Sequence, residues 1–200
     1  MRTFECAVAS AVIHPLALYH WNMRISAAFL LPLHVCEVVI RNAVAEALEQ
    51  QHGVRWPWQE GLHASLPGSA GSYNARDELR HAAARCTSTP SVVATLRFAF
   101  WQQLFTQRFD HGLWRLALPR VLPGSSRIGP PHIARTHLHT ALQRIRLLRN
   151  RIAHHEPIFT RDLADDLATI ARIVTLRCPE VERWMRHSET VTALLRQRPR

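Results

Sequence analysis

Three polar side chains near the end of one predicted helix could carry out acid–base chemistry on a phosphodiester. Arg149, Asn150 and His154 lie in the segment Leu-Leu-Arg-Asn-Arg-Ile-Ala-His-His-Glu-Pro-Ile-Phe, which begins at Leu147. An imidazole titrates near neutral pH, so it can move a proton to or from a ribose hydroxyl or a leaving oxygen. A fixed guanidinium can stabilise the extra negative charge that develops on phosphorus. These residue types therefore favour chemistry that requires no metal ion.

The spacing of the arginine and the histidine decides whether a single helix can bring them together. Arg149 and His154 are five residues apart, so they point about 140° away from each other on an ideal helix. Pro157 forbids further helix and gives the last turn a reason to loosen, which would let the two side chains converge. A dimer that apposes two such helix ends is a second route to a composite site.

The same residue types also have structural interpretations. An arginine near a helix end can cap free carbonyl groups, so Arg149 and Asn150 could serve as a C-terminal cap. His154 and His155 could be solvated imidazoles before a proline, and we expect one of them to be structural. We assign the active role to His154, and a supporting or RNA-binding role to Arg151 and His155.

Glu37 and Arg41 form a second candidate pair. They are one helical turn apart, so the plain expectation is an ion pair worth a few tenths of a kcal/mol if it is exposed. On an otherwise apolar helix the pair is expected to be partly buried. Our hypothesis is that Glu37 orients Arg149 or His154 from a neighbouring helix, with Arg41 in a supporting or RNA-binding role.

No metal or cofactor site is predicted. His132, His137 and His139 lack a cysteine or carboxylate at a recognisable ligand spacing. The four cysteines are scattered without a C-x-x-C pair, which argues against a zinc ribbon and against a dense disulfide framework. Trp21, Trp101 and Trp114 could stack bases, but their place in apolar helical stripes assigns them to packing.

Charge favours a polyanionic partner. The chain has a net charge of +10 and no lysine, so every basic side chain is arginine, which can grip phosphates with a planar fork of donors. A GC-rich coding sequence would produce the same arginine bias, but it would not change the sign of the charge. Charge alone does not separate nucleic acid from an acidic protein.

Apolar residues recur at three- and four-residue spacing almost throughout, which predicts an all-α fold. The first long helix is expected from Leu16 to Gln51, kinked by Pro32 and ended by Gly53. A loop pinned by Trp56 and Trp58 is expected to follow. The later expectations are a short helix over 73–85, a helix capped by Thr89 that continues through Leu104, an irregular connection over 109–131, a motif helix from His132, a helix capped by Thr160, and helical structure from Pro179 to Leu195.

The length of 200 residues suits one domain that spans residues 1–200, with an atypical N-terminal segment at 1–15 and a basic tail at 196–200. The apolar stretch from Ala7 to Ile13 ends at His14-Pro15 before a signal core develops. No later run is expected to reach the length of a membrane span. We predict a cytoplasmic protein with no membrane partner.

Four segments in order resemble the Abi-like family of the HEPN superfamily, which is named for bacterial abortive infection. They are Leu18-Tyr19-His20-Trp21-Asn22, Glu37-Val38-Val39-Ile40-Arg41-Asn42, Phe98-Ala99-Phe100-Trp101 and Arg149 to Phe159. The last contains the R-x4-6-H motif, here Arg149 to His154, with the polar Asn150 after the arginine. The resemblance covers the chain from about residue 16 to its end.

The resemblance implies a HEPN-like helical bundle that often dimerises, with paired motifs forming a ribonuclease cleft. It implies attack of a ribose 2′-hydroxyl on its own phosphate without a metal, which leaves a 2′,3′-cyclic phosphate and a 5′-hydroxyl. Arg149 would bind the scissile phosphate, His154 would act as acid or base, and Asn150 would orient one of them. The expected partners are RNA, a second copy of the chain, and an antitoxin or regulatory protein.

Two other functions remain open at this point. One is a non-catalytic module that binds RNA or protein through the basic motif. The other is a HEPN partner of a nucleotidyltransferase, in which the motif end of the helix is a nucleotide-binding or modification site.

Overall fold

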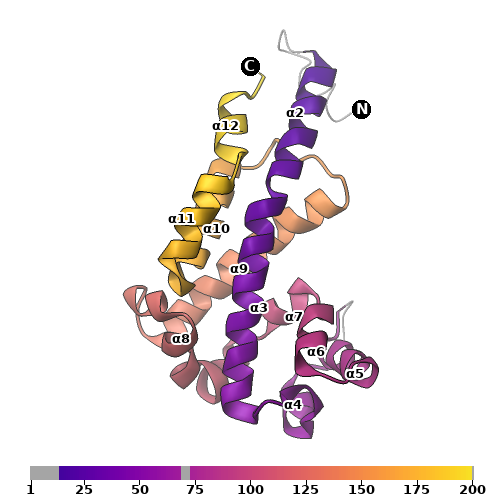
Figure 1. Ribbon diagram of the computed structural model, residues 1–200, viewed down its shortest axis with the longest axis vertical. Coiled ribbons are helices and arrows are strands. Elements are labelled where there is room, and N and C mark those ends of the chain that lie inside the picture. The colour runs from indigo at the N-terminus through magenta and orange to yellow at the C-terminus, as the bar shows by residue number, and fades with distance from the viewer. Residues whose placement is uncertain (1–13, 69–72, 200) are drawn as a thin grey trace. The chain divides into compact units, whose positions relative to one another are not determined.

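The computed structural model describes residues 14–68 and 73–199, and every regular element within them is helical. The all-α prediction is therefore confirmed for this part of the chain (Figure 1). The chain divides into two compact units. The first unit combines Met1–Cys36 with Arg144–Arg200, and the second unit is Glu37–Gln143. The single domain over residues 1–200 stays a prediction, and the stretch from Ala7 to Ile13 lies outside the described residues.

The first unit is built from both ends of the described chain. It contains α2 (Pro15–Ala28), the start of α3 (Leu30–His52), the end of α9 (Pro131–Ala153), α10 (Leu163–Arg177), α11 (Pro179–Ser188) and α12 (Val191–Arg196). Helix α12 packs against α2 and α10, and α10 packs against α11 (Figure 1). The indole Nε1 of the buried Trp21 donates a hydrogen bond to the carbonyl oxygen of Leu194 at 2.7 Å, and the guanidinium of Arg198 lies 5.5 Å from the Trp21 ring. The tail that begins at residue 196 is thus held by a cation–π contact at Arg198.

A one-residue interruption at Phe29, close to Pro32, separates α2 from α3. Pro32 has no amide hydrogen with which to bond the carbonyl four residues earlier, so the hydrogen-bond ladder is interrupted there. Helix α3 then continues to His52, and Gly53 follows it with a φ of 80°, donating a 2.8 Å hydrogen bond to the carbonyl of Glu49. The predicted glycine end is confirmed, and the helix is interrupted at Phe29, near Pro32, while a bend at that point stays a prediction.

The second unit holds the rest of α3 and the start of α9, with shorter helices between them. These are η1 (Trp56–Trp58), α4 (Glu60–Ser65), α5 (Ala75–Arg85), α6 (Thr89–Thr95), α7 (Phe98–Gln103), η2 (Gln107–Phe109), η3 (Asp110–Trp114), α8 (Arg115–Val121) and η4 (Pro123–Arg127). The buried Arg135 of α9 binds the carboxylate of Asp110 with Nε at 2.7 Å and Nη2 at 2.9 Å. Trp101 and Trp114 are fully buried, and Trp21 exposes only 3% of its surface. The assignment of these three tryptophans to packing is therefore confirmed.

Five local expectations about secondary structure were wrong. The connection expected to be irregular over 109–131 contains the helix α8. The expected loop after Trp58 contains the short helix α4, and the expected helix through Leu104 is split at Leu96 and Arg97 into α6 and α7. The split is stabilised from outside the segment, because Glu78 accepts a 2.6 Å hydrogen bond from the Arg97 amide and pairs with its guanidinium at 3.1 Å.

The two N-caps also differ from expectation. Ser88 caps α6 in place of Thr89, and Asp162 caps α10 in place of Thr160. Each observed cap has a side-chain oxygen that reaches the amide three residues ahead.

The segment Pro15–His52 is long and apolar enough to cross a membrane when judged by length and composition alone, with 38 residues and a mean hydropathy of 1.7 in the window tested. The expectation that no run would reach this length was therefore wrong, because the break at Phe29 does not interrupt the hydropathy. One such helix is weak evidence of a span, since the core helices of soluble proteins pass the same test.

Candidate functional site

The motif is carried by the C-terminal end of α9, within the first unit. Leu138, Leu142, Ile145 and Leu148 are buried along one side of α9, which fixes the orientation of the helix about its own axis. Ile152, expected on the same side, is half-buried. The apolar stripe therefore holds the helix almost to its end, and the polar motif residues lie on the remaining surface.

Helix α9 ends in a Schellman motif whose left-handed residue is His155. The His155 amide donates to the carbonyl of Ile152 at 3.1 Å, and the Glu156 amide donates to the carbonyl of Arg151 at 2.8 Å. His155 has a φ of 57°, a conformation usually filled by glycine at this position. A side chain in this region costs about 1–2 kcal/mol, so the helix end carries backbone strain at a motif residue.

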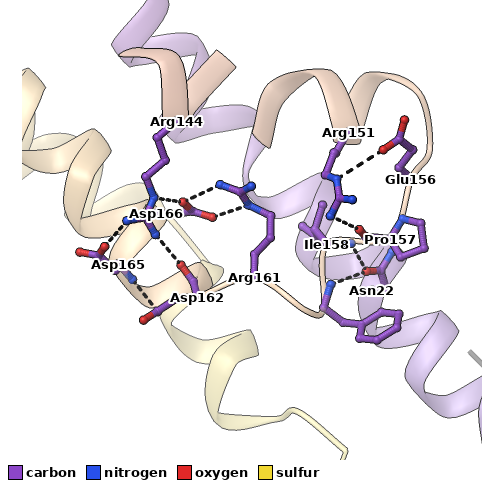
Figure 2. Close-up of polar contacts among 11 residues, drawn as sticks. Asn22, Arg144, Arg151, Glu156, Pro157, Ile158, Arg161, Asp162, Asp165 and Asp166 are labelled. Carbon is purple, nitrogen blue, oxygen red and sulfur yellow. Dashed lines mark hydrogen bonds and ion pairs between the residues drawn. The ribbon is translucent and has the colours of Figure 1, made fainter. Parts of the chain in front are cut away.

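Among the described residues the predicted catalytic side chains have no partners, whereas their neighbour Arg151 does. Arg149 and His154 are exposed and Asn150 is half-buried, and none of the three side chains makes a hydrogen bond or ion pair with any described residue. Arg151 Nη1 instead donates to the carbonyl of Pro157 at 3.4 Å, and its Nε lies 3.4 Å from the carboxylate of Glu156 (Figure 2). The Arg151 side chain thus ties the helix end to the segment after it, and because the Pro157 carbonyl lies outside α9, this contact is not the helix cap that was considered for Arg149 and Asn150.

The end of α9 does not unwind before His154. The His154 amide keeps a helical hydrogen bond of 2.9 Å to the carbonyl of Asn150, so the expectation that a loosened last turn brings Arg149 and His154 together was wrong. On this regular helix Asn150 and His154 are one turn apart and lie on one face, while Arg149 points about 140° away from His154. Within one chain, therefore, the amide and the imidazole share a face and the guanidinium does not.

Asn22 holds the segment that follows the motif. Its Oδ1 accepts hydrogen bonds from the backbone amides of Ile158 at 2.9 Å and Phe159 at 3.2 Å, and all three residues are buried (Figure 2). The segment lacks regular structure, so its amides need such a partner when they are buried. Asn22 occurs in the first segment of the family resemblance, but its chain position gave no sign of this contact.

A cluster of arginines and aspartates anchors the last part of α9 to the start of α10. The buried carboxylate of Asp166 receives Arg144 Nε at 2.5 Å and Arg161 Nε at 2.8 Å (Figure 2). Arg144 also pairs with Asp165 and donates to the carbonyl of Asp162 at 3.2 Å. We call these five residues the arginine–aspartate cluster. Sequence reasoning missed it, because charged residues about twenty positions apart give no pairing signal.

The cluster shifts the acid–base equilibria of two of its members. Hydrogen bonds from Arg172 and then from Arg144 hold the pKa of the exposed Asp165 below its usual value. The hydrogen bond to Asp166 raises the pKa of Arg144, so its guanidinium stays charged. Both shifts favour the charged forms of Asp165 and Arg144 at neutral pH, and with Arg172, which pairs with Asp165, three arginines face the three aspartates.

The other predicted site residues lie in the second unit. Glu37 and Arg41 are half-buried on α3, as expected, but they do not form an ion pair with each other or with another described residue. The orientation of Arg149 or His154 by Glu37 stays a prediction. His132 and His137 are exposed on α9, and no group of three potential metal ligands occurs among the described residues.

No family model matches this sequence, and neither a curated protein nor a solved structure matches it.

Proposed function

We propose that the chain is a metal-independent endoribonuclease of bacterial defence, of the abortive-infection or toxin–antitoxin type, built on a HEPN-like bundle. The observation that carries the proposal is the contrast at the end of α9. Arg149, Asn150 and His154 have no partner among the described residues, while Arg151 beside them contacts the carboxylate of Glu156 and the carbonyl of Pro157. Polar side chains held on a packed helix end and left unpaired are available to a substrate.

The proposed reaction is an internal transesterification of RNA. A base takes the proton of a ribose 2′-hydroxyl, whose oxygen bonds to the adjacent phosphorus. The bond from phosphorus to the 5′-oxygen breaks, and an acid returns a proton to that oxygen, leaving a 2′,3′-cyclic phosphate and a 5′-hydroxyl. His154 supplies the acid or base, Arg149 holds the phosphate, and Asn150, on the His154 face of the helix, orients the imidazole.

The divergence of Arg149 from His154 favours a site made by two copies of the chain. Since the helix stays regular to His154, one chain presents the two side chains about 140° apart. A twofold axis near the end of α9 would bring Arg149 of one protomer toward His154 of the other. We therefore propose a homodimer as the active form, with RNA as substrate and an antitoxin as the regulatory partner.

The first test is cleavage of a mixed RNA pool in EDTA, followed by mapping of the new ends. Wild-type protein should leave cyclic phosphates, and His154→Ala should lose at least about a hundredfold in rate, the lower end of what a general acid or base contributes. His137→Ala, which removes another exposed histidine from α9, should cleave normally. Cleavage by a folded His154→Ala protein at the wild-type rate would refute the assignment.

A second candidate function is RNA binding without cleavage. The directions of Arg149 and His154, about 140° apart on one helix, favour it if the chain acts as a monomer. Arg149 has no partner among the described residues, whereas Arg151 contacts Glu156 and the Pro157 carbonyl, so Arg149→Ala should weaken salt-sensitive RNA binding more than Arg151→Ala does. Arg120→Ala, at an exposed arginine of α8, is the matched control. This function would be favoured over the nuclease if the protein bound RNA without forming a cyclic-phosphate product, and if Arg149→Ala lost that binding while Arg151→Ala and Arg120→Ala kept it.

A further inference from the structure

Helix α2 is apolar on two opposite sides. One side packs inside the first unit, where Leu18, Trp21 and Ile25 are buried and α12 lies against the helix (Figure 1). The opposite side faces solvent, and it also carries large apolar side chains. A helix that is apolar all round is normally covered all round, so the outer side of α2 indicates a surface that has a partner.

The exposed apolar side chains form one stripe from the first turn of α2 to the first residue of α3. They are Leu16 at 53% exposure, Tyr19 at 38%, Met23 at 46%, the exposed Ala27, and Leu30 at 58%. We call these five residues the outer stripe. Intervals of three and four residues place them on one side of a helix. The helical path continues across Phe29, because its amide bonds to the carbonyl of Ile25 at 3.1 Å and its carbonyl accepts from the Leu33 amide at 3.0 Å.

The outer stripe is symmetric about Met23, since its other members lie four and seven residues away on either side. A twofold axis perpendicular to α2 at Met23 therefore places the stripe on an antiparallel copy of itself. Leu16 then lies opposite Leu30, and the large Tyr19 lies opposite the small Ala27, which lets the two surfaces interdigitate. Twofold dimers use the same patch on both copies, so they require a patch that matches itself in this way.

The exposed area is sufficient for a weak dimer. Leu16, Tyr19, Met23 and Leu30 are each about half exposed, which is about 400 Å² per copy if a whole large side chain has about 200 Å². Two copies would bury about 800 Å² from these side chains alone. The exposed Ala27 and the flanking, exposed His20 and Arg24 bring the total above the about 1,000 Å² expected of a biological interface.

The charges around the stripe favour a second copy of the chain over a membrane. Arg24 is the only arginine of α2, and no acidic residue occurs between His14 and Cys36. A helix that lies on a membrane surface is rich in lysine and arginine on its polar side, so a single arginine is too few. In the antiparallel pair the two Arg24 side chains lie on the same side, so added salt should strengthen association by screening their repulsion.

We propose that the outer stripe binds a second copy of this chain, antiparallel about a twofold axis at Met23. The inference deepens the proposed function by naming the surface on which the homodimer forms, and it rests on that function only for the role of the dimer in cleavage. Asn22, next to Met23, holds the amides of Ile158 and Phe159, so the axis lies near the segment that follows the motif.

The first test is sedimentation equilibrium of the full chain at micromolar concentrations. Wild type should form a dimer, and Met23→Glu should weaken dimerisation at least about a hundredfold, because the axis would bury two carboxylates side by side. Leu116→Glu adds the same charge at a leucine of α8 that is 66% exposed and outside the stripe, so it should dimerise as wild type does. A monomeric wild type, or an equal loss in the two variants, would overturn the proposal.

Disulfide cross-linking tests the register and does not depend on the folding of Met23→Glu. On oxidation Met23→Cys should form a linked dimer, because the axis places the two thiols face to face. Leu16→Cys and Leu30→Cys should link to each other when the two proteins are mixed, but neither should link to itself, since fourteen residues of helix separate the equivalent positions by about 21 Å. Wild type with its native cysteines is the control. Self-linking of Leu16→Cys, or no linking of Met23→Cys beyond the wild-type level, would show that the twofold pairing is wrong.

Membrane binding and cleavage are measured separately. If vesicles of phosphatidylcholine and phosphatidylserine bind monomeric wild type but not Met23→Glu, the stripe binds lipid and the proposal fails. A dimer that depends on the stripe but cleaves no RNA leaves this interface standing and counts against the nuclease. Cleavage by monomeric Met23→Glu at the wild-type rate would overturn the role of this dimer in catalysis.

Discussion

Replacing Asn22 with alanine should destabilise the first unit and release the segment after the motif. The Oδ1 of Asn22 is the acceptor for the buried amides of Ile158 and Phe159. Its removal leaves two buried donors, and each unsatisfied donor costs about 1–3 kcal/mol. The space left by the amide group is polar enough to admit water, which recovers part of the loss. We therefore expect a loss of about 3 kcal/mol in the free energy of unfolding.

Urea unfolding and amide hydrogen exchange measure this effect together. A loss of 3 kcal/mol corresponds to about a hundredfold faster exchange at Ile158 and Phe159, since about 1.4 kcal/mol is a factor of ten. Asn42→Ala is the matched control, because Asn42 is exposed and such changes usually stay within about 0.5 kcal/mol. If Asn22→Ala lost no more stability than Asn42→Ala and both amides kept their wild-type protection, the tethering role of Asn22 would be wrong.

Three further changes test the strain and the charges around the motif. His155→Gly should raise the free energy of unfolding by about 1 kcal/mol in urea unfolding, because glycine adopts a positive φ without the steric cost, while His155→Ala should give no such gain. Asp166→Asn should destabilise the protein by about 3–5 kcal/mol by the same assay, because Arg144 and Arg161 would lose their buried countercharge, and a loss under 1 kcal/mol would show that water replaces it. The lowered pKa of Asp165 stabilises the folded state above the unfolded pKa of about 3.9, and this contribution is lost as pH falls through the lower folded pKa. The melting temperature of wild type should therefore fall more than that of Asp165→Asn below about pH 4. Parallel curves of melting temperature against pH would contradict this.

Local backbone chemistry made much of the fold predictable. Pro32 and Gly53 act through their own geometry, so the interruption near Pro32 and the end of α3 could be predicted without knowing any partner. The apolar stripe of α9 was equally predictable, because a helical period of about 3.6 residues places its apolar side chains on one side of the helix. The same periodicity failed at Leu96, where the apolar pattern continues but Glu78 from α5 captures the Arg97 amide.

The residues of the candidate site could be predicted from the sequence, but the contacts that hold them in place could not. The types and spacing of Arg149, Asn150 and His154 were visible in the sequence. Which of Arg149 and Arg151 has a partner depends on where the chain after the helix places Glu156 and Pro157. Contacts across long sequence separations, such as those of Asn22 with Ile158 and of Arg144 with Asp166, follow from packing and leave no local pattern. The same holds for the left-handed conformation at His155, which is unusual for any residue but glycine.

The division of the chain has a consequence during translation. The second unit is one continuous stretch, but the first unit joins α2 to helices that lie after Arg144. The ribosome therefore delivers Trp21 long before its acceptor at Leu194, and at about 5–20 residues per second the delay is about 10–30 s. The motif at the end of α9 is likewise synthesised before Asp166 can anchor it. A nascent or prematurely terminated chain would present the motif without its supports, so assembly of the site is postponed until synthesis is nearly finished.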